Sequence, residues 1–342
     1  MSRAAIISFR LNLNDGVSIV AATWQRALEQ LGFEVSTIAG EGPVDRIVAG
    51  LAIDARQAAS VSELEGALRG FDLVIVENVL TIPLNLEASL NLAEVLAGRR
   101  AILHHHDPAW QRAHLAHLDV LPPDDPHWRH VVINDLTKAE FEARGLQATR
   151  IYNGFEPDPP IGNRDATRES LGVSSAERLF VHPVRAIERK DIPTAVAICE
   201  ELNATYWLIG PAEEGYGPTL AKILASAQCR VIHTSGYSPA DFYAACDAVL
   251  FPSTWEGFGN PPIEAATYLK PALVGPYAVA EELEQLGFKW FHPDQADRLD
   301  AFLKSPKINL LHHNSETVRQ FLSIETMTNA IHELLIEAGW TP

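Results

Sequence analysis

The chain of 342 residues has little of what marks secreted or membrane proteins. Its three cysteines, Cys199, Cys229 and Cys246, lie far apart in the sequence and form no Cys-x-x-Cys motif. An odd number of separated cysteines is typical of reduced structural thiols in a cytoplasm. No run approaches the ~20 apolar residues of a membrane span, and the apolar stretch at residues 4–7 is too short for a signal peptide. We therefore expect a soluble, cytoplasmic protein.

Positive charge is also scarce. The chain has 27 Lys and Arg against 44 Asp and Glu, a formal net charge of −17, and its first lysine is Lys138. Proteins that bind nucleic acids or anionic membranes usually carry clustered Lys and Arg. The composition therefore argues against nucleic acid and against membrane association, and any phosphate group that the protein binds is expected to be small.

The length predicts two globular domains, because one hydrophobic core rarely grows past roughly 250–300 residues. A hydrophobic content of 47% excludes intrinsic disorder. Short apolar runs alternate with amphipathic stretches, which is the pattern of parallel sheets covered by helices. In the first half we expect strands at residues 4–9, 35–38, 51–53, 73–76, 101–105 and 131–133, with helices such as 17–31 and 86–97 between them.

A segment rich in Pro, Gly, Asn and Asp, residues 153–165, is predicted to be a linker. The alternation then restarts, with strands expected at residues 179–184, 206–209, 230–232, 248–251 and 272–274. Two α/β domains joined in this way are expected to enclose an interdomain cleft, where the carboxyl ends of both sheets face one ligand. The C-terminal helix, residues 324–338, is expected to cross back to the first domain.

The run AVLFPSTWEGFGNPPIEAATYLKPALVG, residues 248–275, carries the most specific chemistry. An apolar strand enters a loop containing Glu256, and a helix that contains Glu264 follows two prolines. We expect Asn260 to be the N-cap of this helix, whose N-terminus can attract an anion, although Pro261 and Pro262 supply no N–H. Carboxylates accept hydrogen bonds from sugar hydroxyls; the alternative is a solvated loop residue and a helix-dipole partner.

Upstream, in HPVRAIERKDIPTAVAI, Arg185 and Lys190 follow the first strand of the second half. Two cations at the mouth of a strand can neutralise a diphosphate, Arg by a bidentate fork and Lys as a point charge. The alternative is a solvated cluster, since Glu188 and Arg189 lie between them.

Together, Arg185, Lys190, Glu256 and Glu264 resemble the signature of retaining glycosyltransferases of family 4, which have the GT-B fold of two Rossmann-like domains. Further segments of the second half resemble this family in the expected order: WLIGPAEEGYGPTLAKI, HTSGYSPADFYAACDAVLFPS and YLKPALVG. The resemblance implies an N-terminal acceptor-binding domain at residues 1–157 and a C-terminal nucleotide-sugar-binding domain at residues 158–323, with residues 324–342 packed back on the first.

The resemblance also implies roles for these residues. Arg185 and Lys190 would hold the donor diphosphate and stabilise it as the leaving group, Glu256 would contact donor-sugar hydroxyls, and Glu264 would bind the nucleotide ribose. Further donor contacts are implied for the loop residues Gly257, Phe258, Gly259 and Asn260. In the first domain the family has a glycine-rich loop, of which this chain keeps Gly16 in a turn with Asn14 and Asp15, and we expect Gly16 to approach the donor phosphate or the acceptor.

The first half also contains AILHHHDPAWQR, a predicted strand that ends in three histidines and an aspartate. Alternation along a strand sends His104 and His106 to one face and His105 to the other. The family usually has a histidine here beside the donor sugar, which His106 matches, with His105 second. Together with ENVLTIPLNL the segment resembles a subgroup associated with mannosylglucosylglycerate synthesis, which implies a small anionic acceptor bound by His104, His105, Asp107 and Arg112. Buried structural histidines are the alternative.

The resemblance implies a retaining hexosyltransferase that moves mannose or glucose from a nucleoside-diphosphate sugar, such as GDP-mannose, to a small soluble acceptor, such as glucosylglycerate. His106, Arg185, Lys190 and Glu256 would be its catalytic residues. The base remains open among GDP, UDP and ADP, and the oligomeric state is not indicated. No Asp-x-Asp motif appears, so no metal site ligated by the protein and no tightly bound cofactor are expected, while Mg²⁺ is compatible with the donor. The alternatives are a sugar-nucleotide 2-epimerase, a transferase with a lipid or polysaccharide acceptor, and a non-catalytic nucleotide-sugar-binding module.

Overall fold

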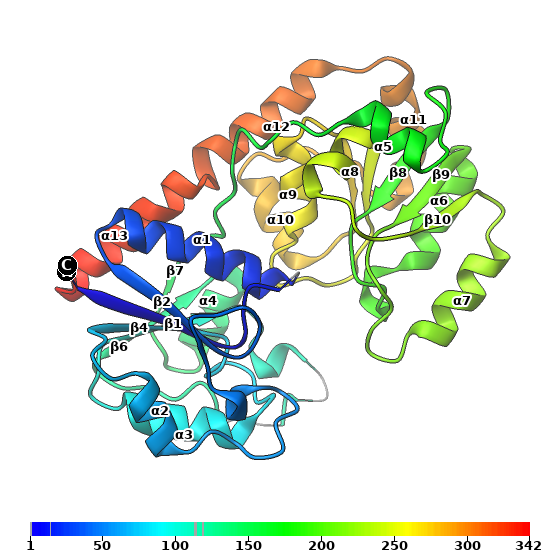
Figure 1. Ribbon diagram of the computed structural model, residues 1–342. Helices are drawn as coiled ribbons and strands as arrows, with labels where there is room; N and C mark the ends of the chain where they lie inside the picture. The colour runs from blue at the N-terminus through cyan, green and yellow to red at the C-terminus, as the bar shows by residue number, and fades with distance from the viewer. Residues whose placement is uncertain (1, 14, 113–114, 118–119) are drawn as a thin grey trace. The chain divides into compact units, whose positions relative to one another are not determined.

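The computed structural model describes residues 2–342 except residues 14, 113–114 and 118–119. Asn14, expected in a turn with Asp15 and Gly16, lies outside the described residues. The chain divides into two compact units (Figure 1). The first contains residues up to Gly154 together with Ile324–Pro342, and the second contains Phe155–Ser323. The sequence places this boundary at residue 157, three residues later.

The first unit is built on a parallel sheet in the order β3-β2-β1-β4-β5-β6-β7. Its central strands are buried along their whole length, as expected when helices cover both faces of a sheet. The chain therefore starts in the middle of the sheet, builds one side, and returns to build the other. The strands are β1 (Arg3–Arg10), β2 (Glu34–Glu41), β3 (Arg46–Ile47), β4 (Leu73–Glu77), β5 (Ala101–His105), β6 (Trp128–Val132) and β7 (Ala148–Arg150).

Helices cover the two faces of this sheet with separate apolar cores. One core joins α1 and α13 to the sheet, and the other joins α2 and α3 to the opposite face (Figure 1). Short side-chain caps begin several of these helices; Asp15, for example, accepts a hydrogen bond from the N–H of Ser18 at the start of α1. The helices are α1 (Gly16–Gln30), α2 (Val61–Ala67), α3 (Leu86–Leu96), α4 (Asp135–Ala143) and α13 (Ile324–Ala338), with short 3₁₀ turns η1 (Ala49–Leu51) and η2 (Ala109–Gln111).

The C-terminal helix α13 belongs to the first unit and packs against α1. Ile331, Leu334 and Leu335 on one face of α13 are buried in the same core as Trp24 of α1, whereas Ile336 is 56% exposed. The 3.6-residue period of the apolar positions places them on one stripe. The first unit is therefore assembled from both ends of the chain.

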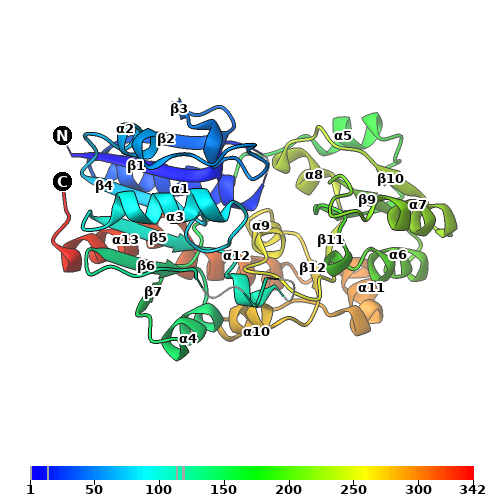
Figure 2. The same cartoon turned by 90° about the horizontal axis from the view of Figure 1, so that it is seen from below.

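The second unit contains a five-stranded parallel sheet in the order β10-β9-β8-β11-β12 (Figure 2). The first sheet has the same order at its centre, where β3-β2-β1-β4-β5 corresponds to β10-β9-β8-β11-β12. In both sheets the first strand of the unit, β1 or β8, lies next to the fourth, β4 or β11. The strands are β8 (Arg178–His182), β9 (Ala204–Leu208), β10 (Val231–His233), β11 (Ala248–Phe251) and β12 (Ala272–Val274).

Helices again flank this sheet: α6 packs on β9, and α9 packs on β11 and β12 and contacts α12. Among the described helices of the chain, none combines the length and the apolar character that a membrane crossing requires. The helices of the second unit are α5 (Arg164–Ser170), α6 (Ile192–Glu201), α7 (Gly217–Ser226), α8 (Pro239–Ala245), α9 (Asn260–Thr267), α10 (Ala278–Gln285), α11 (Ala296–Lys304) and α12 (Ile308–Phe321), with 3₁₀ turns η3 (Glu188–Lys190) and η4 (Pro293–Gln295).

The predicted α/β class with parallel sheets is confirmed, with differences in detail. The strand expected at residues 51–53 is wrong, because the chain turns there as η1, which buries Leu51 and Ala52 and leaves Ile53 40% exposed. The short edge strands β3 and β7 have exposed or half-buried residues and therefore no apolar run to reveal them. The predicted linker ends earlier than expected, because Asn163 caps α5 and starts that helix at Arg164.

The packing of α13 on the first unit gives a stability prediction. Replacing the fully buried Ile331 by Ala leaves a cavity between α13 and α1 and should lower the free energy of unfolding by about 2–5 kcal/mol. Replacing the exposed Ile336 of the same helix by Ala should change it by less than about 0.5 kcal/mol. Urea unfolding followed by circular dichroism measures both variants, and equal losses would contradict this packing.

Candidate functional site

A cluster of charged residues lies at the carboxyl edge of the second sheet, between β8 and β11. These two strands are neighbours, but the chain leaves them in opposite directions, β8 toward β9 and β11 toward β12. Such a switch in strand order leaves a crevice beyond the strand ends, where open α/β sheets bind their ligands. The loop after β8 carries Arg185, Arg189 and Lys190, and the loop after β11 carries Glu256.

Glu256 holds two cations in this place. Its Oε1 accepts a hydrogen bond from Nζ of Lys190 at 2.5 Å, and its Oε2 accepts one from the guanidinium of Arg189 at 2.6 Å. Arg189 also donates to the carbonyl of Trp255 at 2.9 Å, and its own carbonyl accepts from the N–H of Thr254. The two loops are thus joined by ion pairs and backbone bonds across the switch point.

Burial makes this cluster sensitive to the loss of any member. Burial lowers the pKa of Lys190 to about 8, against the attraction of Glu256, so that the amine remains protonated at neutral pH. Burial alone would raise the pKa of Glu256, but the neighbouring charges of Lys190 and Arg189 outweigh it and lower this pKa. At neutral pH the three groups therefore form one anion and two cations, with an excess of one positive charge.

Arg185 lies at the more accessible side of the group. Its guanidinium pairs with Glu213 at 2.6 Å, and both side chains are more than one third exposed. Its charge is close enough to contribute to lowering the pKa of Lys190. A surface pair of this kind contributes little to stability, so the guanidinium can exchange Glu213 for an anionic ligand at small cost.

The helix α9 begins beside this cluster, although not as predicted. Its N-cap is Gly259 rather than Asn260, and no side chain caps it. Gly259 has a φ of +94°, and a Cβ at this position would lie 2.0 Å from Oη of Tyr277. Only glycine fits such a turn. The first turn of α9 contains no acidic side chain, which leaves the positive end of the helix dipole for an anion even though Pro261 and Pro262 donate nothing.

The aromatic residue of this loop is built into the unit. Phe258 is buried and its ring stacks on Phe155 with centroids 6.2 Å apart. Gly257, which precedes it, is half-buried. The loop that the sequence assigns to the donor is therefore fixed at Phe258 by packing.

Glu264, predicted to bind ribose, lies in the second turn of α9 with its own set of partners. Its Oε2 accepts a hydrogen bond from Oη of Tyr243 at 2.7 Å. Burial raises the pKa of Glu264, with the hydrogen bond from Tyr243 opposing this effect. The carboxyl group is thus held without a cationic partner like those of Glu256, and it is suited to accept hydrogen bonds from neutral hydroxyl groups.

In the first unit, the corresponding switch point lies between β1 and β4. Gly16 begins α1 after β1, and among the described residues beyond its chain neighbours and its own helix backbone no atom lies within 4 Å of the position that a Cβ would take there. Asp15 caps the helix and pairs with Arg10 at 3.4 Å. The surroundings of Gly16 thus leave room for a ligand group, as the prediction requires.

The three histidines separate between two faces as predicted. His104 and His106 both meet the buried carboxylate of Glu77 at the end of β4, the first at 3.0 Å and the second at 2.6 Å. Their ring centroids are 4.4 Å apart. One ligand atom from each of Glu77, His104 and His106 lies within 4.8 Å of the others, a donor set of the kind that can hold a metal ion. From the sequence, no metal ligands are predicted here.

His105 is a correction to the sequence analysis. Its side chain is fully buried on the other face, with Nδ1 2.6 Å from the hydroxyl of Thr81 and Nε2 2.9 Å from Nδ1 of His130. Both ring nitrogens are occupied, so His105 has no atom to offer an acceptor or a donor sugar.

His104 is corrected in the same way. Its side chain is fully buried beneath Trp24, with ring centroids 4.4 Å apart. Because no atom of this side chain reaches the surface, its burial favours the alternative of a structural histidine over the predicted binding of the acceptor. His106 keeps a small exposed fraction of 7% and is the histidine of the three that a ligand can reach.

The remaining predicted acceptor residues form a pair. Arg112 lies 3.3 Å from the carboxylate of Asp107, and both side chains are partly exposed. The N–H groups of His106 and Asp107 both donate to Oδ1 of Asn78, which holds this turn at the end of β5. Arg112 is therefore placed near the carboxyl edge of the first sheet, with part of its charge balanced by Asp107.

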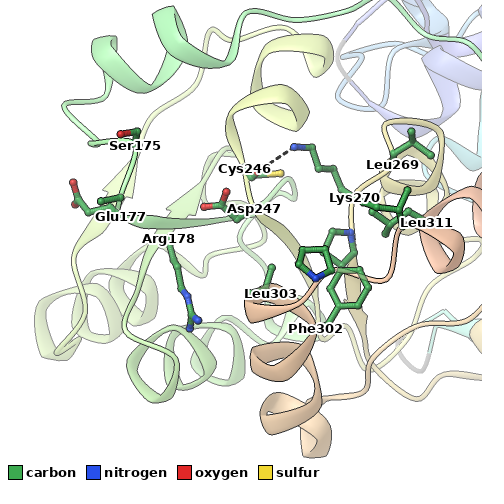
Figure 3. Close-up of a pocket in the computed structure, with 14 residues that line it drawn as sticks. Ser175, Glu177, Arg178, Cys246, Asp247, Leu269, Lys270, Phe302, Leu303 and Leu311 are labelled. Atoms are coloured by element: carbon green, nitrogen blue, oxygen red, sulfur yellow. Dashed lines mark hydrogen bonds between the residues drawn. The ribbon is translucent and has the colours of Figure 1, made fainter.

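A separate cavity of about 380 Å³ lies at the opposite edge of the second sheet (Figure 3). Arg178, Asp247 and Lys270 line it, and these residues stand at the amino ends of β8, β11 and β12. The ammonium group of Lys270 donates hydrogen bonds to the carbonyls of Ala244 and Cys246 and is thus bound within the protein. This cavity is thus distinct from the cluster around Glu256, which lies at the carboxyl edge.

The structure adds residues that the sequence analysis did not select. Arg189 is an ion-pair partner of Glu256 and not only a residue between Arg185 and Lys190. Its position next to Lys190, in the turn η3, is the feature of the sequence that could have indicated this role. For Glu77, the sequence indicates only that it follows an apolar strand, and not that it contacts two histidines. Glu213 and Tyr243 come from distant segments, and no sequence spacing links them to Arg185 or Glu264.

Known protein families and solved structures resemble this chain in its second unit and in its fold. Residues 163–321 match the family described as "Glycosyl transferases group 1", and solved GT-B enzymes share the fold over nearly the whole chain. One example is Anabaena HepE in complex with UDP-glucose, which has a TM-score of 0.75 and 17% sequence identity over 98% of this chain and 100% of that one. Another is sucrose-phosphate synthase from Thermosynechococcus elongatus, which has a TM-score of 0.77 and 15% sequence identity over 98% of this chain and 99% of that one. The chain therefore has the GT-B fold, and its second unit matches a glycosyltransferase family.

Relatives with assigned activities narrow the comparison. The chain is 24% identical to mannosylglucosylglycerate synthase of Thermotoga maritima over 84% of each chain. It is likewise 24% identical to the enzyme of the same name from Petrotoga mobilis, over 83% of this chain and 85% of that one. The predicted resemblance to glycosyltransferases, and to this subgroup, is therefore confirmed.

The two glutamates give opposite predictions for stability. Glu256→Gln leaves Arg189 and the buried Lys190 without their anion and should lower the free energy of unfolding by about 3–5 kcal/mol at pH 7. Because the folded-state pKa of Glu256 is lowered, its contribution is present above the unfolded pKa and is lost as the pH falls through the folded one.

For Glu264 the effect of ionisation on the free energy of unfolding has the opposite sign to that for Glu256. Its folded-state pKa is raised, so its ionisation costs stability as the pH rises through the unfolded pKa. Glu264→Gln should therefore leave stability at pH 7 unchanged or higher, and the difference from the wild type should vanish in acid. Urea titrations of both variants at pH 4 and pH 7 test this, and a large loss in Glu264→Gln at pH 7 would contradict it.

Proposed function

We propose that the protein transfers a hexose from a nucleoside-diphosphate sugar to a hydroxyl group of a small soluble acceptor, with retention at the anomeric carbon. The observation that carries the proposal is the group of Arg185, Arg189 and Lys190 beside the N-terminus of α9, at the carboxyl edge between β8 and β11. This place suits a diphosphate, because cations and a helix N-terminus both attract its charge.

The donor diphosphate has to share Lys190 with Glu256. In this structure Glu256 supplies the negative charge that a buried lysine requires, so the cluster is balanced before the donor arrives. Arg185 is exposed enough to swing from Glu213 to a phosphate oxygen, where its fork can form two hydrogen bonds. The excess positive charge of the cluster then opposes the charge that develops on the leaving diphosphate.

The two glutamates would contact the rest of the donor. Glu256 lies in the loop after β11 and accepts from cations on one side, which orients its carboxylate for sugar hydroxyls on the other. Glu264, held by Tyr243 and without a cationic partner like those of Glu256, is the residue we assign to the ribose hydroxyls. The loop residues Gly257, Phe258, Gly259 and Asn260 and, in the first unit, Gly16 would complete the donor contacts.

We assign the acceptor to the first unit. His106 and Arg112 stand at the carboxyl edge of its sheet, and Arg112 offers a positive charge for a carboxylate such as that of glucosylglycerate. The names of the relatives from Thermotoga and Petrotoga support mannose transfer to such an acceptor. The net charge of −17 favours a soluble acceptor over an anionic lipid surface.

Retention would follow from the geometry of the leaving group. As the bond from the anomeric carbon to the diphosphate breaks, a phosphate oxygen takes the proton of the acceptor hydroxyl, and that hydroxyl oxygen forms the new bond on the same face. The products are a glycoside and a nucleoside diphosphate. Arg185 and Lys190 stabilise the charge on the departing oxygen, and no protein nucleophile is required.

A panel of donors and acceptors tests the proposal. The protein is incubated with GDP-mannose, UDP-glucose or ADP-glucose, each with and without glucosylglycerate, and released nucleoside diphosphate and new glycoside are measured. Release of nucleoside diphosphate that depends on glucosylglycerate supports the transfer. An epimerised sugar without acceptor would indicate an isomerase, donor binding without turnover a binding module, and turnover with lipid or polysaccharide alone another acceptor class.

Replacing Arg185 by Ala should lower kcat/KM for the donor by about 100-fold, because one charge at the leaving group is lost. Arg178→Ala is the matched control. Arg178 belongs to the strand that precedes the same loop, pairs with Asp300 in a partly exposed bridge, and stands at the amino end of the sheet. Steady-state kinetics should separate the two variants; equal activities would contradict the assignment of the diphosphate to Arg185.

Retention is tested on the product itself. With an α-linked donor the product should be the α-glycoside, which the one-bond ¹³C–¹H coupling at the anomeric carbon of the purified product distinguishes from the β-glycoside. A β-glycoside would show inversion and would exclude proton transfer to the departing diphosphate on the same face.

A further inference from the structure

A buried carboxylate lies between two imidazole rings at the carboxyl edge of the first sheet. Glu77 is the last residue of β4, is fully buried, and pairs in register with His104 of the neighbouring strand β5. Nδ1 of His104 lies 3.1 Å and 3.0 Å from its two oxygens, and Nε2 of His106 lies 2.6 Å from Oε2. Glu77 is not among the residues that the proposed function places in contact with donor or acceptor.

The next residue holds the backbone of the same histidine. Asn78 has a φ of +66°, and its side-chain oxygen accepts the N–H groups of His106 and Asp107 at 3.1 Å and 3.3 Å. The dipeptide Glu77–Asn78 thus fixes His106 twice, at the ring by the glutamate and at the main chain by the asparagine.

The rings also pack on one another at tilted angles, which restricts their rotation. Trp24 of α1 packs on His104, and His104 packs on His106, each with centroids 4.4 Å apart. Since Trp24 and His104 are fully buried, His106 is supported from below by a rigid pair of rings. Its ring orientation is therefore set by Glu77 on one edge and by His104 on one face.

The hydrogen bonds decide which nitrogens carry protons. The two neighbouring imidazoles lower the pKa of Glu77 to about 2, although burial opposes them, so Glu77 is a carboxylate that only accepts. Nδ1 of His104 and Nε2 of His106 must then both donate. Burial also lowers the pKa of His104, which keeps that ring neutral. His106 is left with Nδ1, which has no hydrogen-bond partner among the described residues.

A metal ion is the other occupant that this donor set allows. Two ligands of one tetrahedral zinc ion at about 2.0–2.1 Å from the metal lie about 3.3 Å apart. Oε2 of Glu77 and Nε2 of His106 are 2.6 Å apart, which is the separation of two atoms that share a proton. The observed distances therefore favour a hydrogen-bonded carboxylate–histidine pair.

We propose that Glu77 is a positioning residue that locks His106 as the tautomer protonated at Nε2, so that the lone pair of Nδ1 is offered to a substrate hydroxyl group. This inference rests on the proposed function for the identity of the hydroxyl, a sugar hydroxyl of donor or acceptor. The lock itself is a property of the protein without substrate, since every contact that creates it lies within the first unit.

The tautomer is measured directly on the full-length protein. The chain is labelled with ¹⁵N at histidine, and two-bond ¹H–¹⁵N correlation spectra at pH 7.5 distinguish protonated from unprotonated ring nitrogens. The signals of His106 are assigned by their absence in His106→Gln. The expected result is a protonated Nε2 and an unprotonated Nδ1.

Glu77→Gln tests the cause. The amide carries no charge and replaces one of the two accepting oxygens by an NH₂ donor, so it competes less well for the N–H groups of both rings. The spectrum of His106 should therefore show the tautomer protonated at Nδ1 or a mixture of the two. The kcat of transfer should fall about 10- to 100-fold, as when a histidine loses its orienting carboxylate, while the KM for the donor changes less than about 3-fold.

Asp124→Asn is the matched control. It replaces a carboxylate by an amide beside another histidine of the same unit, His130, whose Nε2 lies 3.1 Å from Oδ1 of Asp124. This variant should leave both the His106 spectrum and kcat unchanged. Circular dichroism and urea unfolding of both variants show whether the chain remains folded; should Glu77→Gln not fold, the wild-type spectrum alone decides the tautomer.

Three results would overturn the inference: a wild-type His106 protonated at Nδ1, a His106 spectrum unaltered in a folded Glu77→Gln variant, or a shift of the Nε2 signal on addition of one equivalent of Zn²⁺, which would assign the cluster to a metal. Failure of the proposed function gives a different pattern. The protein would then show no transfer with any donor, yet the tautomer of His106 and its dependence on Glu77 would be as stated.

Discussion

The ion cluster around Glu256 depends on one constraint, the adjacency of β8 and β11 at the centre of a parallel sheet. The cations come from the loop after the first strand and the anion from the loop after the fourth, nearly 70 residues later. Because all strands run in one direction, both loops leave the same edge, and because the strand order reverses there, no helix crosses between them. A buried lysine with two neighbouring arginines is tolerable only with an anion at this place, so sheet order and charge balance support each other.

The first unit repeats this arrangement with other chemistry. At the end of β4, which occupies the place that β11 has in the second sheet, Glu77 is again a buried carboxylate that holds two basic groups, here imidazoles. Glutamate suits both places because it can accept hydrogen bonds on two oxygens while it cancels one charge. The difference lies in the partners: lysine and arginine retain an excess of positive charge, which fits a diphosphate, whereas imidazole rings offer ring nitrogens in fixed directions, which fit hydroxyl groups.

Much of the fold could be predicted from the apolar pattern. Strands such as β5, β11 and β12 are short apolar runs buried on both faces, and their bounds agree with the prediction to the residue. Segments without such runs, β3 and β7, were not predictable because edge strands bury little. In the site, Arg185, Lys190 and Glu256 were predictable as charges on loops after strands, and Glu264 from its place in the helix after two prolines and from the family resemblance. The burial of His104 and His105 was not, because alternation along a strand gives the face of a side chain and not what covers that face.

The sequence by itself determined the class of fold, the family resemblance and the position of most charged residues on loops after strands, since these depend on local periodicity and on spacing within a few dozen residues. The tertiary structure alone decided which charges are paired. Arg189 rather than Arg185 shares Glu256 with Lys190, Arg185 pairs with Glu213, and Glu77 joins His104 to His106. These pairings join residues 27 to 67 positions apart along the chain, and they form because strand order brings their loops to one edge of each sheet. At Glu256 and Glu77 burial also makes an unpaired charge too costly to leave.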